Sequence, residues 1–147
     1  MLKKMGQRLK NERGLTLIEL LAVVVILGII AAIAIPSIGG LINNSKKDAH
    51  IANAQQMVSG ARLAITADQA ATGDIKMKDL IDKGYLEAFE NPSDDAGYEL
   101  DKSIVTIKKS DTTGNYSYTV TLVGKTGDKK HITDIDPDKV KRDEVKL

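Results

Sequence analysis

The sequence predicts an α+β protein in which one long N-terminal helix packs its second half on a small antiparallel sheet of three or four strands. Residues 15–35 are largely apolar and include one charge, Glu19. Apolar residues then recur at helical spacing from 51 to 65, and alternating β-branched and aromatic residues follow between 98 and 132. A chain of 147 residues accommodates one small domain with an appendage.

The charges are divided unevenly along the chain. Residues 1–14 include five Lys and Arg side chains and one Glu, which leaves 16 basic and 19 acidic residues, a net charge of −3, in the remainder. This balance excludes the overall basic field that draws a protein to nucleic acid. The absence of cysteine excludes disulfides and thiolate metal sites.

The segment 15–35 is long enough to cross a membrane. Its 21 residues, at a helical rise of about 1.5 Å each, reach roughly 30 Å, the thickness of the hydrocarbon core. Because Lys and Arg cluster just before it, residues 1–14 are expected in the cytoplasm. A conventional signal peptide is the weaker alternative: Ala32 and Ala34 form an A-x-A-like site, but the apolar run is too long and helical periodicity continues beyond it.

The nine residues from Arg13 to Leu21, RGLTLIELL, resemble the prepilin signature of type IV pilins and their relatives. The resemblance implies a pilin fold, cleavage after Gly14 by a dedicated membrane peptidase, and N-methylation of the new first residue, Leu15. It also assigns Glu19, the fifth mature residue, to filament assembly. Two features depart from the family: most members have Phe where this chain has Leu15, and the frequent pair of C-terminal cysteines is missing.

Glu19 has a physical role that fits this resemblance. Cleavage would leave an ammonium group on Leu15 among apolar helices, and a carboxylate on a neighbouring subunit would neutralise it. Because an unpaired buried charge is costly, the pair would reject misaligned subunits.

The long helix is expected to weaken and then resume. Pro36 removes one helical hydrogen bond, and Gly39 and Gly40 are poor helix formers, so these residues predict either a break that opens during assembly or a mild kink with no functional change. Its second, amphipathic part is marked by a stripe that ends before Thr72–Gly73: Ile51, Ala54, Val58, Ala61 and Ile65. The predicted divisions are therefore a leader at 1–14, a membrane and filament-core helix at 15–35, an amphipathic helix at 36–72 and a globular region at 73–147.

Within the globular region, residues 78–83 predict a short helix that Gly84 ends. Strands are predicted around 98–100, over 104–107 and 116–122, and around His131, with turns at 110–114 and 124–128. The charged tail 136–147 is predicted to be frayed or a short helix.

Sites for chemistry are sparse in this sequence. Asp134, Asp136 and Asp138 are candidates for a calcium site, but a solvated acidic loop is the favoured interpretation because the EF-hand glycine and bidentate glutamate are missing. His50 and His131 lack triad or zinc-motif companions and are expected at the surface. No enzyme activity and no cofactor are predicted.

The predicted function is a prepilin whose mature form is the subunit of a pilus-like filament for adhesion, motility or DNA uptake. The resemblance implies a homopolymer formed through the N-terminal helix, and as partners a prepilin peptidase, a membrane platform protein and an assembly ATPase. It implies a single-pass membrane protein that becomes an extracellular filament. The alternatives are a major pseudopilin of a type II secretion system, or a minor or competence pilin that binds DNA, for which Lys46–Lys47 and Lys108–Lys109 are weak candidates.

Overall fold

The computed structural model describes the backbone of residues 2–67 and 72–147, and the side chains of 16–67 and 72–147. The chain divides into two compact units, Met1–Ile42 and Asn43–Leu147. We call the second unit, Asn43–Leu147, the head.

Helix α1, Leu2–Ala67, contributes to both units. The helix continues through Pro36, Gly39 and Gly40, so the predicted break is not open in this structure. One proline removes a single hydrogen bond, and the bonds on either side hold the turn. Opening during assembly stays a prediction.

The predicted end of the amphipathic segment falls on residues that the structure does not describe. The described helix ends at Ala67, and residues 68–71 of the predicted amphipathic segment lie outside the described residues. Gly73 begins a strand with φ +108°, a backbone conformation that glycine adopts most readily.

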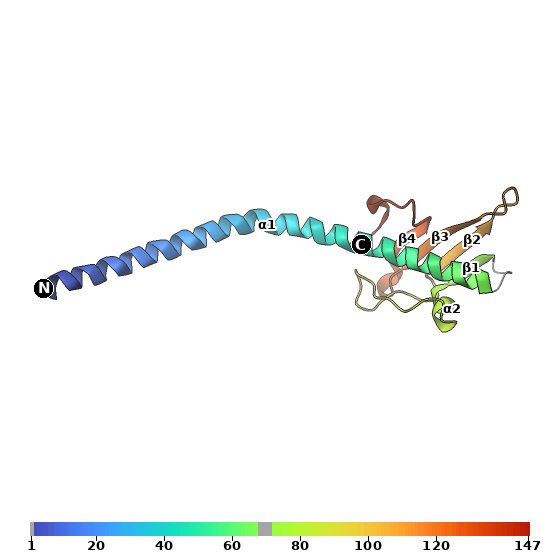
Figure 1. The fold of residues 1–147 in the computed structure, drawn as a ribbon, viewed down its shortest axis with the longest axis horizontal. Helices are drawn as coiled ribbons and strands as arrows, with labels where there is room; N and C mark the ends of the chain where they lie inside the picture. The colour runs from blue at the N-terminus through green and yellow to red at the C-terminus, as the bar shows by residue number, and fades with distance from the viewer. Residues whose placement is uncertain (1, 68–71) are drawn as a thin grey trace. The chain divides into compact units, whose positions relative to one another are not determined.

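The head is built on a four-stranded antiparallel sheet in the order β1-β2-β3-β4 (Figure 1). The strands are β1 Gly73–Lys76, β2 Ile104–Lys109, β3 Tyr116–Val123 and β4 Lys130–Ile135. The predicted strands at 104–107, 116–122 and around His131 are confirmed as β2, β3 and β4. The predicted turn at 110–114 is also confirmed, because Ser110 and Gly114 form main-chain hydrogen bonds within it.

The first strand is the exception. The sequence predicts it around 98–100, but Tyr98 forms only an isolated bridge with Gly124, and residues 73–76 pair with β2 instead. Gly73 and Asp74 have low strand propensity, so β1 owes its conformation to pairing along the free edge of β2.

Helix α2, Met77–Asp82, confirms the predicted short helix and its stop. Gly84 has φ +75°, and its N–H bonds to the carbonyl of Ile81. This turn returns the chain toward α1, where the carbonyl of Tyr85 lies so close to Gly60 that a Cβ there would meet it at 2.9 Å.

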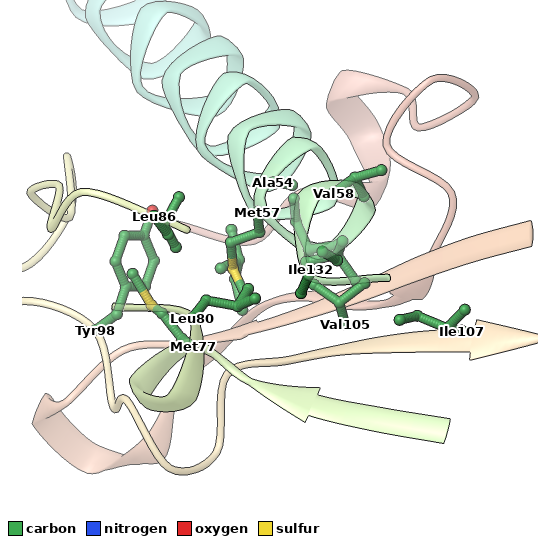
Figure 2. Packing of buried hydrophobic residues seen from close by; sticks show 14 of the residues in the cluster. Ala54, Met57, Val58, Met77, Leu80, Leu86, Tyr98, Val105, Ile107 and Ile132 are labelled. Carbon is green, nitrogen blue, oxygen red and sulfur yellow. The ribbon is translucent and has the colours of Figure 1, made fainter. Parts of the chain in front are cut away.

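The core lies between the second half of α1 and the sheet (Figure 2). Four of the five predicted stripe residues are buried and Ile51 is half-buried. Met57 and Ala64 join them on the same face of α1. On the sheet side the core consists of Val105, Ile107, Val120, Leu122 and Ile132.

Of the two expectations for the charged tail, the frayed one is wrong, and a short helix is present as the 3₁₀ turn Arg142–Glu144. In residues 141–147, which we call the strap, Val145 is buried, and the Lys146 N–H donates to the carbonyl of His131. Arg142 forms two hydrogen bonds of 2.6 Å to the carboxylate of Asp48 on α1. The strap therefore combines one apolar anchor and one ion pair with main-chain bonding, which the charged composition concealed.

Candidate functional site

The apolar surface of α1 is the most prominent feature of the first unit. All large apolar side chains from Leu17 to Ile42 are exposed, with Leu17 and Ile33 each at 70%. Among the described residues, α1 is the one helix long and apolar enough to cross a membrane. Since a helix that is apolar on all sides belongs in lipid or among other helices, this surface requires a covering that the described chain does not supply.

Glu19 lies exposed within that surface. Within residues 16–67 and 72–147, no basic side chain forms an ion pair with it. A carboxylate among apolar side chains costs a few kcal/mol in a membrane, and such residues usually have a partner. Gly14 and Leu15 belong to α1, but the side chain of Leu15 lies outside those that the structure describes.

An exposed apolar helix with one carboxylate, continued by an amphipathic half on a four-stranded antiparallel sheet, is a pilin-like α+β arrangement. Residues 9–35 match the family model of the prokaryotic N-terminal methylation motif, which is the class III signal sequence of type IV pilins and pseudopilins. The motif supports a type IV pilin or pseudopilin precursor, a structural protein that is inserted into the membrane before assembly. Comparisons with curated proteins and with solved structures give no match.

The three aspartates considered for calcium are not brought together. The carboxylate of Asp134 accepts a hydrogen bond from the Thr119 hydroxyl, whereas that of Asp136 accepts the N–H of Asp138 and pairs with Lys139 at 3.5 Å. In the described part of the chain no three His, Cys, Asp or Glu side chains gather around one point. Asp134 lies in β4 with φ +49°, beside the register shift between β3 and β4.

The two histidines form a buried cluster, so the expectation of surface positions is wrong. His50 is 0% exposed and His131 2%. Their rings stack with centroids 4.2 Å apart and planes 21° apart. We call these two residues with Tyr98, Asn91 and Ser93 the histidine cluster. One sequence pattern does indicate part of it: His50 lies four residues before Ala54 and so extends the apolar stripe of α1.

Hydrogen bonds satisfy both nitrogens of His50. Nδ1 lies 2.7 Å from the Tyr98 hydroxyl, and Nε2 lies 2.9 Å from the Ser93 hydroxyl. Asn53 donates to the same Tyr98 oxygen, and burial raises the pKa of Tyr98 to about 12. If Tyr98 donates to Nδ1, each of these groups is satisfied with a neutral imidazole.

Burial lowers the pKa of His50 to about 3, and repulsion from His131 and Lys46 adds to this effect. The head therefore binds His50 in its neutral form, whereas the unfolded chain protonates it near pH 6.5. Its contribution to stability is complete above pH 6.5 and is lost progressively as the pH falls toward 3.

We expect the head to lose up to about 2 kcal/mol of stability through His50 between pH 7.5 and pH 5.0. Thermal unfolding of the full chain in detergent micelles, followed by near-ultraviolet circular dichroism of the tyrosines, measures this loss. All four tyrosines belong to the head, so the signal reports on it. His50→Gln retains a hydrogen-bond donor but does not titrate, and it should have a shallower pH dependence. Equal pH dependence in both proteins would contradict the assignment.

Two basic side chains lie over tyrosine rings on the head. Lys109 Nζ is 5.6 Å from the centre of the Tyr116 ring, and the Arg62 guanidinium is 5.1 Å from that of Tyr118. The neighbouring Lys108 is exposed. Cation and ring pairs occur both as contacts within a protein and in sites that bind single-stranded nucleic acid.

Proposed function

We propose that the mature chain, beginning at Leu15, is the structural subunit of a type IV pilus-like extracellular filament. The exposed apolar length of α1 is the observation that carries this proposal. In the precursor the lipid bilayer covers this surface. In the filament the equivalent helices of other subunits replace the lipid, so that one surface serves first as an anchor and then as the polymer core.

Glu19 would set the register of this polymer. A free α-ammonium on Leu15 exists only after cleavage, and in a helical core it needs a carboxylate from another subunit. Pairing with Glu19 satisfies both charges in one alignment and leaves both unpaired in all others. Local opening at Pro36, Gly39 and Gly40 would let the helix bend as the subunit leaves the bilayer.

The proposal includes the partners that act on such a precursor. A prepilin peptidase would cut after Gly14 and methylate Leu15, and a membrane platform protein and an assembly ATPase would drive polymerisation. The protein would wait in the cell membrane with its N-terminus in the cytoplasm and then become part of an extracellular filament.

Two alternatives keep the same precursor but change its use. As the major pseudopilin of a type II secretion system it would form a short periplasmic fibre, and deletion would stop secretion without removing surface filaments. As a minor or competence pilin it would bind DNA through the head. The positions of Lys109 and Arg62 over tyrosine rings favour this second hypothesis. Salt-sensitive DNA binding that is lost in Lys108→Ala/Lys109→Ala would support it.

We expect subunits in sheared surface filaments to begin at Leu15. N-terminal sequencing and intact mass measurement check this result and show whether Leu15 has gained a methyl group. Gly14→Leu should leave the precursor uncut in the membrane, because the peptidase must accommodate a large side chain beside the cleaved bond. A mature chain that begins elsewhere, or normal cutting of the variant, would contradict the processing site.

A further inference from the structure

The histidine cluster holds the strap on the head by a reciprocal contact. His131 Nδ1 lies 2.7 Å from the carbonyl oxygen of Lys146, and the Lys146 N–H donates to the His131 carbonyl at 3.0 Å. Val145, the residue before this contact, is buried in the core. The position of residues 145–146 therefore depends on where the His131 ring lies.

The partners of His131 determine which of its nitrogens holds the proton. A carbonyl oxygen can only accept, so Nδ1 must donate to Lys146. In a neutral ring Nε2 is then an acceptor, and the Asn91 side-chain amide, 3.2 Å away, can donate to it. The structure thus fits the neutral Nδ1–H tautomer of His131.

Asn91 cannot adapt to a second proton on this ring. Its Oδ1 accepts the N–H of Ser93 at 2.9 Å, and its Nδ2 also donates to the carbonyl of Gly97 at 3.3 Å. Rotating the amide to offer oxygen to His131 would break both contacts. A protonated His131 would therefore direct Nε2–H at another N–H group, which is repulsive in a buried site.

The His131 ring is confined on its stacked face and at Nε2, and elsewhere it borders a pocket of about 200 Å³ that Thr126, Lys129 and Leu147 also line. His50 stacks on it, and Gly124 approaches so closely that a Cβ at that position would lie 2.7 Å from His131 Nε2. A positive His131 would further repel any charge on the stacked His50. A proton on His131 is accommodated most readily when the ring leaves its site.

The charged groups near the cluster are Asp94 and Lys129, which line the same pocket as His131, and Lys46 and Asp48 on α1. The carboxylate of Asp94 interacts electrostatically with His131. Its oxygens accept hydrogen bonds from the Thr126 N–H and hydroxyl and from the Ala96 N–H. From α1, Lys46 repels a charge on His50. Asp48 is paired with Arg142, and this exposed pair holds the strap only weakly.

We propose that the histidine cluster is an acid-sensitive latch, in which protonation of His131 releases residues 144–147 of the strap from the head. Release uncovers the part of the core that Val145 closes while the sheet and α1 stay folded. The inference holds whichever filament the subunit builds, because it depends on contacts within the head alone.

The chain has no cysteine, so one nitroxide label reports the strap directly. Lys146→Cys suits this purpose because its side chain is exposed and its latch contacts are made by the main chain. Lys108→Cys on β2 is the matched control. The full chain in detergent micelles is titrated from pH 8 to pH 5, and label mobility is measured by electron paramagnetic resonance.

We expect the Lys146→Cys label to be immobile at pH 8 and to become mobile in one step in mildly acidic solution, while the Lys108→Cys label stays unchanged. His131→Asn retains a donor near Nδ1 but does not titrate, so the strap should stay docked at pH 5. His50→Gln retains both His131 and Asn91, so release should persist. A strap that is mobile at pH 8, remains docked in the unmutated background at pH 5, or is released equally in His131→Asn would overturn the latch.

A second measurement decides the case even if His131→Asn does not fold. Imidazole ¹⁵N spectra of the unmutated chain distinguish the two neutral tautomers. We expect the Nδ1–H form of His131 at pH 8 and a titration whose midpoint coincides with strap release. An Nε2–H tautomer, or midpoints that differ by more than the error of measurement, would refute the mechanism.

Discussion

Glu19→Gln should insert into the membrane and lose its leader normally, yet yield few or no filaments. The substitution keeps the size and polarity of the side chain but leaves the Leu15 ammonium of a neighbouring subunit without a counter-charge. Removing one partner of a buried ion pair costs about 3–5 kcal/mol. At each subunit contact this corresponds to a loss of about 100-fold or more in the association constant. The yield of sheared filaments, set against the amount of mature subunit in the membrane, measures the effect.

Glu19→Asp is the matched control, because it keeps the charge and shortens the side chain by one methylene. It should assemble better than Glu19→Gln, although the shorter reach weakens the pair. Filaments at normal yield from Glu19→Gln would show that Glu19 is a tolerated shallow carboxylate with no function in assembly. Loss of the mature subunit from the membrane would instead place its role before assembly.

Leu122→Ala should destabilise the head by about 3 kcal/mol. Leu122 is 0% exposed and lies on β3 within the core that α1 covers. Truncation removes apolar contacts and leaves a cavity that the surrounding strands and helix cannot fully close. Because small domains have a total stability of about 5–15 kcal/mol, this is a large fraction. Urea unfolding of the full chain in micelles, followed by tyrosine circular dichroism, gives the change in midpoint.

Leu63→Ala is the control for this substitution. Leu63 has the same side chain but is 58% exposed on α1. Its truncation should change stability by no more than about 0.5 kcal/mol, as is usual for surface positions. An equal loss in both variants would contradict the placement of the core between α1 and the sheet.

The elements that the sequence predicts correctly are those whose patterns are local. The second half of α1 follows from apolar spacing at 54, 58, 61 and 65, and β3 from strict alternation. Gly84 marks the end of α2 because few other residues adopt its positive φ. The methylation motif is likewise a local pattern, which is why Gly14, Leu15 and Glu19 can be chosen as candidates without a structure.

The errors concern residues whose conformation depends on distant partners. Strand β1 is a four-residue segment of low strand propensity that forms along the edge of β2. The strap has a charged composition, yet Val145 and Arg142 find partners that lie far away in the sequence. No periodicity within either segment reports such contacts.

The sequence by itself determined that this chain has an N-terminal methylation motif, an apolar helix and an α+β head, because each is encoded by neighbouring residues. Only the tertiary structure decided that His50 and His131 stack as buried rings and that the strap bonds to His131. Those rings are 81 positions apart in the sequence and are placed by the packing of α1, β4 and the 91–98 loop. Burial and fixed hydrogen-bond partners, which no sequence pattern specifies, are the physical reason that we assign the latch to His131.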